Sequence, residues 1–181
     1  MPSPSLTSMM GFERKLVIGV GGMAISNNQA MILTTYSLGS CLGVTIYDPV
    51  SHVGGLLHAM LPDSSINAAK AAAQPAMFVD TGIGALFRAT YALRAEKNRM
   101  QICVAGGASF LDQSGVFNIG ERNYACLTRL LAQNGLTIDA KDVGGLVSRT
   151  LHLHIGTGEV RLKCSGQNAD TILFKGYANV G

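Results

Sequence analysis

Short apolar segments separated by turn residues fill the first sixty positions of the chain. They predict strands over residues 15–20, 30–36, 43–47 and 55–60. The turn signals between them are Gly21-Gly22, Asn27-Asn28 and Asp48-Pro49, and Pro62 ends the last strand because proline has no backbone N–H to donate. We therefore expect neighbouring strands in this third of the chain.

Two later segments place apolar residues at helical spacing instead. The first predicts a helix over residues 78–98, and the second a helix that Asn118 caps and that stops at Asn134-Gly135. Their apolar stripes are Ile83, Leu86, Phe87 and Tyr91 in the first and Tyr124, Leu127 and Leu131 in the second. Residues 64–75 are small and rich in Ala, which we interpret as a mobile loop with room for a helical turn.

Further strands are predicted over residues 100–104, 136–143, 148–155, 159–164 and 171–174. Strands and helices do not alternate regularly, which favours an α+β domain of packed layers over a doubly wound sheet. The Ser/Pro-rich start, residues 1–12, is expected to be flexible. Residues 13–181 are long enough for one domain with a substantial core.

Composition narrows the classes of function. Hydrophobic residues make up 48% of the 181 positions and charged residues 14%, and the net charge of +3 is scattered along the chain without a basic run. A nucleic-acid partner is therefore not expected. The N-terminus lacks the pattern of a signal peptide and no stretch is apolar enough to cross a bilayer, so we expect a cytoplasmic protein without membrane insertion. Its four cysteines should then be free thiols.

A dinucleotide-binding motif is the first candidate site. Gly19-Val20-Gly21-Gly22-Met23-Ala24 fits the loose G-x-G-x-x-G/A fingerprint and follows a predicted strand. However, residues 26–29 read as a turn where the fingerprint requires the N-terminus of a helix to hold the pyrophosphate. The glycines are better explained by a tight bend.

Two further patterns are equally weak. His152 and His154 lie on one face of an alternating strand and could bind a metal, but no third ligand has a recognisable spacing, so an exposed strand face explains them. Ser109 and Ser114 lie near glycines without forming a nucleophile elbow, which excludes a serine hydrolase of that type.

Cys41 and His58 form a more promising pair. Cys41 closes the small-residue run Leu38-Gly39-Ser40-Cys41 and His58 follows seventeen positions later, so that neighbouring predicted strands could bring the two residues together. A thiol and an imidazole are the minimum for nucleophilic catalysis. From these residues alone, a buried thiol at a sheet turn and a hydrogen-bonded core histidine are favoured over a catalytic pair.

Longer stretches around this pair resemble the CheD family of chemotaxis proteins. They are Thr34-Thr35-Tyr36-Ser37-Leu38-Gly39-Ser40-Cys41-Leu42-Gly43-Val44, Tyr47-Asp48-Pro49 and Gly54-Gly55-Leu56-Leu57-His58-Ala59-Met60-Leu61-Pro62. Later landmarks follow in the family's order: Val79-Asp80-Thr81, Gly106-Gly107-Ala108, Asn118-Ile119-Gly120-x-Arg122-Asn123, and Asp142-x-Gly144-Gly145 with Arg149.

The resemblance implies a chemoreceptor glutamine deamidase, a protein-glutamine glutaminase whose site is similar to that of toxin deamidases. It implies a layered α/β/β fold, with Cys41 as nucleophile, His58 as base and Thr35 as the residue that orients the base. Thr34 is adjacent and chemically equivalent to Thr35, so the sequence leaves this choice open. The substrate would be the cytoplasmic domain of chemoreceptors, and neither a cofactor nor a metal is expected.

The small residues Gly39 and Ser40 let backbone N–H groups approach a substrate closely, so we expect the oxyanion hole at these positions. Glutamyl methyl ester hydrolysis would use the same chemical steps. The resemblance also implies docking to a CheC-type phosphatase.

Two rival functions stay open at this point. One is a non-catalytic adaptor that regulates a CheC-type phosphatase and keeps Cys41 for packing. The other is a metal module built from Cys41, His58, His152 and His154.

Overall fold

The computed structural model describes residues 13–109 and 117–176, so the N-terminal segment 1–12, Ser114 and the last five positions lie outside the described residues. The described parts form ten strands and three α-helices. The strands are β1 (Arg14–Val17), β2 (Met23–Ser26), β3 (Met31–Leu38), β4 (Leu42–Asp48), β5 (Val53–Ala59), β6 (Gln101–Gly106), β7 (Ala140–Val143), β8 (Arg149–His154), β9 (Val160–Cys164) and β10 (Thr171–Phe174). The helices are α1 (Ala68–Ala73), α2 (Val79–Ala92) and α3 (Ile119–Gln133), with short 3₁₀ turns η2 (Ser64–Ile66), η3 (Pro75–Met77) and η4 (Lys97–Arg99).

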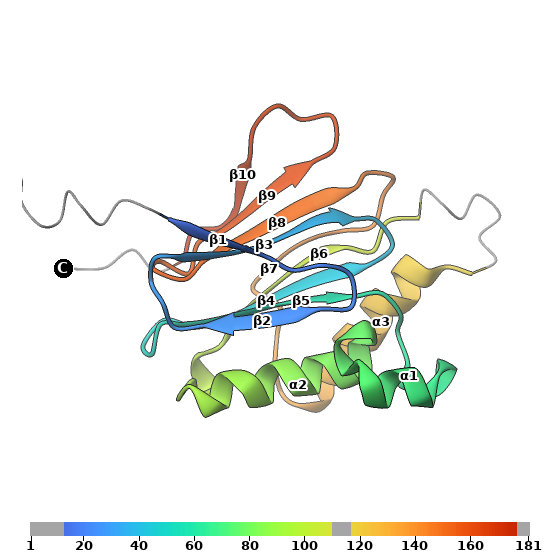
Figure 1. Cartoon of the computed structure of the whole chain (residues 1–181). Helices are drawn as coiled ribbons and strands as arrows, with labels where there is room; N and C mark the ends of the chain where they lie inside the picture. Colours follow the sequence, from blue (N-terminus) through green and yellow to red (C-terminus); the bar gives the residue numbers. More distant parts are fainter. Residues whose placement is uncertain (1–12, 110–116, 177–181) are drawn as a thin grey trace, which may run out of the picture.

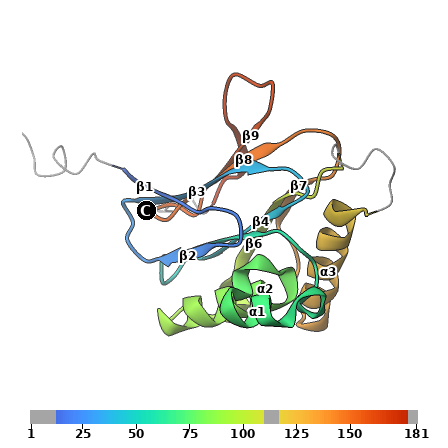
Figure 2. The same cartoon turned by 45° about the vertical axis from the view of Figure 1, so that its right-hand side comes forward.

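The strands form two mixed sheets of five. One sheet has the order β1-β3-β8-β9-β10 and the other the order β2-β5-β4-β6-β7. The helices lie together on one side, next to the second sheet, while the first sheet lies beyond it (Figures 1 and 2). This arrangement confirms the predicted α+β class and its α/β/β layering.

The sheet β2-β5-β4-β6-β7 is the middle layer of the protein, and its central strands β4 and β5 pack on both faces. Both strands are buried at every position. One set of side chains, such as Val44 and Leu57, packs with the helices, and the other, such as Leu56, packs with Leu33 and Leu151 of the first sheet. The protein thus has two apolar cores, one between the helices and the middle sheet and one between the two sheets.

Most strands coincide with their predictions, and the discrepancies have physical causes. The prediction missed β2, because it interpreted the glycine-rich segment only as a bend and a turn. The loop expected over 64–75 instead contains η2, α1 and the start of η3, and Asn67 caps α1 by accepting the Lys70 N–H.

The two long helices need smaller corrections. Helix α2 ends at Ala92 rather than near residue 98, and Arg94 just beyond it has a positive φ of 70°. Helix α3 begins and ends as expected, but Asn118 takes a left-handed conformation and its side chain makes no capping hydrogen bond. The strand predicted over 136–143 is also shorter, since β7 comprises only its last four residues.

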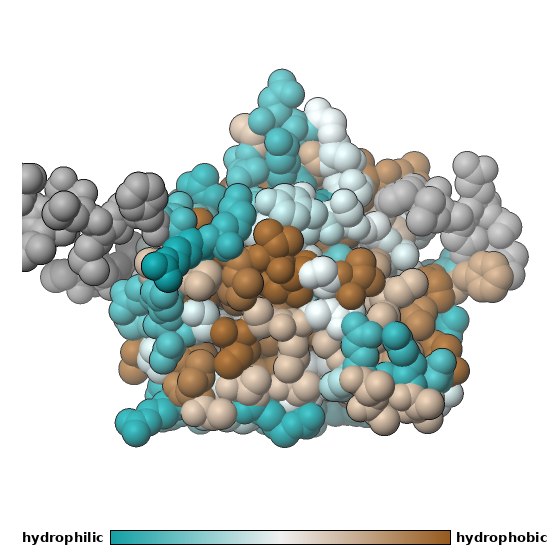
Figure 3. All heavy atoms as spheres, in the orientation of Figure 1, coloured by the Kyte–Doolittle hydropathy of each residue, from teal (hydrophilic) through white to brown (hydrophobic). Residues whose placement is uncertain are grey.

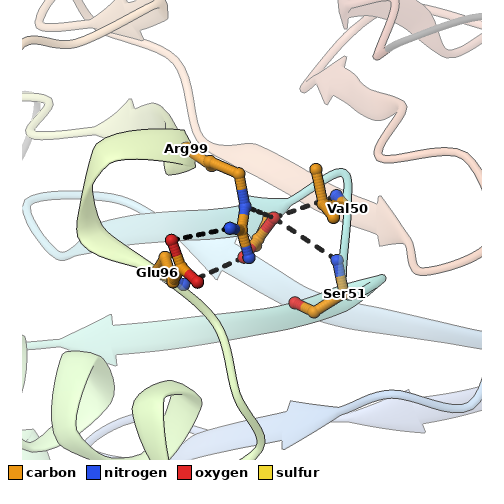
Figure 4. A network of polar contacts seen from close by, with 5 residues as sticks. Val50, Ser51, Glu96 and Arg99 are labelled. Carbon is orange, nitrogen blue, oxygen red and sulfur yellow. Dashed lines mark hydrogen bonds and ion pairs between the residues drawn. The ribbon is translucent and has the colours of Figure 1, made fainter.

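Asp48 holds the turn after β4 through a network of polar contacts (Figure 4). Its carboxylate accepts hydrogen bonds from the Val50 and Glu96 N–H groups and forms an ion pair of 2.7 Å with Arg99. Burial alone would raise the pKa of Asp48, but the Arg99 guanidinium and these N–H groups outweigh burial and hold the pKa well below its usual value. The end of β4 opposite Cys41 is therefore fixed by a buried charge.

Hydrophobic side chains gather in the middle of the face where the edge strands β1 and β2 lie (Figure 3). Leu16 and Val17 of β1 are among the exposed large apolar residues, and Val20 follows them along the chain. Within the described residues, no helix has both the length and the apolar character needed to span a bilayer.

Candidate active site

Thr35 and His58 meet in the space between the two sheets. Thr35 lies on β3 of the first sheet and His58 on β5 of the middle sheet, and Thr35 Oγ1 is 2.7 Å from His58 Nδ1. Their exposed fractions are 0% and 1%. Thr34 points to the other face of β3, because successive residues of a strand alternate, and it contacts His152 instead at 2.8 Å. The geometry therefore distinguishes the two threonines that the sequence left equivalent.

A second contact of Thr35 determines the tautomer of His58. Thr35 Oγ1 donates its only hydrogen to the Ile18 carbonyl oxygen at 2.7 Å. It must then accept from His58, which places the imidazole proton on Nδ1 and a lone pair on Nε2. Within residues 13–109 and 117–176, the buried Nε2 atom has no hydrogen-bond partner. A hydrogen-bond acceptor is thus held ready on the side of the ring away from Thr35.

Cys41 directly precedes β4, the strand next to β5. His58 pairs with Gly43 across these antiparallel strands, two positions beyond Cys41. Residues two apart share a face of a strand, so a continuation of β4 by one residue would place Cys41 diagonally opposite His58, and Gly43 between them carries no side chain. Cys41 also packs against the core between the two sheets, on the same side as His58, and is only partly buried.

Burial keeps both groups neutral in the resting protein. Desolvation raises the pKa of the Cys41 thiol above its usual value, and a hydrogen bond from the residue's own backbone N–H partly offsets this. Desolvation also lowers the pKa of His58 to about 4. At neutral pH Cys41 is therefore a thiol and His58 a neutral imidazole.

The turn that carries Cys41 is held through its carbonyl groups. The Gly39 carbonyl accepts the Ala108 N–H at 2.8 Å, and the Cys41 carbonyl accepts the Gly107 N–H at 2.9 Å. The Ser40 carbonyl accepts the Asn123 side-chain amide at 3.0 Å. In the described part of the chain, the N–H groups of Gly39 and Ser40 donate to no backbone carbonyl. The carbonyl groups of this turn are therefore engaged by the protein, and among the described residues no backbone carbonyl competes for the Gly39 and Ser40 N–H groups, which an oxyanion hole would need.

The Gly106-Gly107 pair makes this anchoring possible. Gly106 has a φ of +112°, and a Cβ atom there would overlap the Cys41 carbonyl oxygen. Gly107 has a φ of +62°. Both conformations favour glycine, and they let the chain leave β6 close to the turn that carries Cys41. The sequence marked these residues and Asn123 only as landmarks, because their partners lie about 60 to 80 positions away along the chain.

The loop between β1 and β2 also supports the site. The Gly21 N–H donates to the His58 carbonyl at 2.8 Å, and the His58 N–H donates to the Gly22 carbonyl at 2.9 Å. The glycines thus bring the loop alongside the backbone of the histidine. The rejection of a dinucleotide site agrees with the structure, since the strand β2, and no helix, follows them.

The four residues of the rival metal module are not brought together. His152 lies on the outer face of the first sheet against Thr34, whereas His58 lies between the sheets. Over 13–109 and 117–176, no group of three or more His, Cys, Asp or Glu residues has the geometry of a metal site. The expectation that His152 is exposed was wrong: it is 8% exposed, and its ring lies edge-on to Tyr36.

Comparisons with known proteins give a consistent result. A family model described as "CheD chemotactic sensory transduction" matches residues 60–164. A protein of Syntrophus aciditrophicus named "Probable chemoreceptor glutamine deamidase CheD 1" is 47% identical over 83% of this chain and 94% of its own length. Relatives named "Probable chemoreceptor glutamine deamidase CheD" from Solibacter usitatus and Pyrococcus abyssi are 40% and 39% identical over 87% and 83% of this chain, and 94% and 91% of their own.

Proposed function

Because this chain belongs to the CheD family, we propose that it deamidates glutamine side chains of chemoreceptors, converting them to glutamate. The relatives carry this activity in their names. The observation that supports it best in this protein is the state of His58. Its Nδ1–H donates to Thr35, and its Nε2 lone pair has no hydrogen-bond partner among the described residues, on the strand next to the one that follows Cys41. This is the arrangement that a base needs to deprotonate a neighbouring thiol.

In the first half of the reaction, His58 Nε2 takes the proton of the Cys41 thiol as the sulfur attacks the carboxamide carbon. The negative charge moves to the carboxamide oxygen, where the N–H groups at Gly39, Ser40 and Cys41 stabilise it. His58, now protonated, gives its proton to the departing nitrogen. Ammonia leaves and a glutamyl thioester remains on Cys41.

In the second half, water replaces ammonia. His58 removes a proton from the water molecule, which attacks the thioester carbonyl, and the same proton then returns to the Cys41 sulfur. The products are a glutamate side chain and the free thiol. Thr35 keeps the ring in one tautomer and orientation throughout, but its neutral hydroxyl gives the imidazolium no charge stabilisation of the kind a carboxylate provides.

On a receptor, the reaction would add one negative charge and one site for methylation at each converted position. Methyl ester hydrolysis at glutamate is a second reaction of the same site, because only the leaving group changes from ammonia to methanol.

A CheC-type phosphatase is the proposed regulatory partner. The substrate and this partner are both cytoplasmic, so we propose the same location for this chain.

The test is mass spectrometry of a purified receptor cytoplasmic fragment after incubation with the protein. Each converted glutamine raises the mass by about one dalton, and Cys41→Ala and His58→Ala should abolish the change. Cys164→Ala is the matched control, since Cys164 is another partly buried free thiol and lies on β9. Conversion that persists in Cys41→Ala would exclude this mechanism.

The alternative is a non-catalytic adaptor that regulates a CheC-type phosphatase. It predicts that the wild-type protein leaves the receptor mass unchanged while still binding the phosphatase, with the same affinity in Cys41→Ala. The receptor experiment therefore separates the two proposals.

A further inference from the structure

Asn123 connects the two segments that carry the proposed catalytic residues. Its side chain is fully buried on α3, and its Nδ2 group donates to the Ser40 carbonyl and to the Met60 carbonyl, at 3.0 Å each. Ser40 directly precedes Cys41, and Met60 follows His58 by two positions. One amide group therefore bridges the nucleophile turn and the end of the strand that carries the base.

The orientation of this amide is fixed by its partners. Two carbonyl oxygens can only face the NH₂ end of the side chain, because an amide oxygen in that place would repel both. The Asn123 Oδ1 atom is buried and has no hydrogen-bond partner among the described residues. An unpaired buried acceptor is unfavourable, so the two hydrogen bonds that the Nδ2 group donates are what explains an asparagine at this position.

The hydrogen bond to Ser40 also sets the direction of the next N–H group. The Ser40 carbonyl and the Cys41 N–H belong to one planar peptide unit, in which they point in opposite directions. Holding the Ser40 oxygen on the side of α3 therefore turns the Cys41 N–H away from α3. The preceding unit is held in the same way, because the Ala108 N–H binds the Gly39 carbonyl.

We propose that Asn123 is a positioning residue that aims the Cys41 N–H at the oxyanion formed when Cys41 attacks an acyl carbon. The hydrogen bond it donates also polarises the peptide, which strengthens the Cys41 N–H as a donor. This role deepens the proposed deamidation and rests on it only for the identity of the substrate. A merely structural clamp would instead support the pair Cys41 and His58 as a whole.

Two reactions of Cys41 distinguish these roles. Iodoacetamide alkylates the sulfur by direct displacement and forms no oxyanion, whereas p-nitrophenyl acetate acylates it through a tetrahedral oxyanion. Both rates are measured for the wild type, Asn123→Ala, Asn123→Asp and the milder Asn123→Ser, with Cys41→Ala as background. Leu131→Ala is the stability control, since Leu131 is buried on the same helix, two turns beyond Asn123.

We expect acylation to fall about 10- to 100-fold in the Asn123 variants while alkylation changes less than about threefold. Leu131→Ala should leave both rates per folded molecule unchanged. A parallel fall of both reactions, or unchanged acylation, would overturn the proposal, and the ratio of the two rates is informative even in a destabilised variant. Receptor deamidation is measured separately. If the wild-type protein reacts with p-nitrophenyl acetate but does not deamidate the receptor, the proposed substrate is wrong and the role of Asn123 still stands.

Discussion

The buried neutral imidazole of His58 should make the stability of the protein depend on pH. In the folded protein the pKa of His58 is lowered to about 4, against an ordinary value of 6.5. Between these values the unfolded chain takes up a proton that the folded protein does not. The free energy of unfolding should therefore fall as the pH is lowered from about 6.5 to about 4, and this group stops contributing below that range. The difference between the two pKa values corresponds to about 3 kcal/mol.

The measurement is urea-induced unfolding of the wild type and of His58→Gln at several values between pH 7.5 and pH 4. The variant is needed because burial also lowers the pKa of His152, so the pH dependence of the wild-type free energy of unfolding includes more than one histidine. The free energy of unfolding of the wild type, relative to that of the variant, should fall by about 3 kcal/mol between neutral pH and pH 4. A difference that stays constant over this range would refute the assignment of a buried neutral His58.

Three further substitutions test the surroundings of the site. Thr35→Val removes both hydrogen bonds of the hydroxyl, so we expect a loss of about 1–3 kcal/mol in urea unfolding and at least about tenfold lower deamidation, and unchanged turnover would contradict its role in orienting His58. Gly106→Ala places a Cβ against the Cys41 carbonyl at a φ of +112°, so the unfolding temperature should fall and Cys41 should react more slowly with p-nitrophenyl acetate. An unchanged unfolding temperature and an unchanged rate would show that the turn can relax. Asp48→Asn should lower the unfolding temperature by about 5 °C or more but leave turnover per folded molecule unchanged, because Asp48 lies at the opposite end of β4.

The sequence could predict the parts of the fold that depend on local patterns. Apolar runs bounded by turn residues located β3 to β6 and β8 to β10, and helical spacing located α2 and α3. Strand β2 was missed because only its pairing with β5 makes Met23–Ser26 extended. The end of α2 was missed because Arg94 takes a positive φ just beyond Ala92 although no glycine or proline marks this end in the sequence.

For the candidate site, motifs identified the residues but not their spatial relations. Thr34 and Thr35 have the same chemistry, and only the alternation of β3 between the two sheets assigns each to its histidine. Asn123 lies 83 positions from the carbonyl it holds beside Cys41, so no local pattern could reveal its role. Contacts that join distant parts of the chain are set by the packing of layers, which a single sequence does not display.

The hydrogen bond between Thr35 and His58 crosses from one sheet to the other, although both residues and Cys41 lie in the first third of the chain. The strands that support them come from the remainder, since β8 pairs with β3 and β6 pairs with β4. A fragment cut after β5 would keep all three side chains and lose the scaffold that aligns them. We therefore expect a nascent or clipped chain to carry its thiol without the proposed base aligned beside it, so that deamidation would begin only once the whole polypeptide has folded.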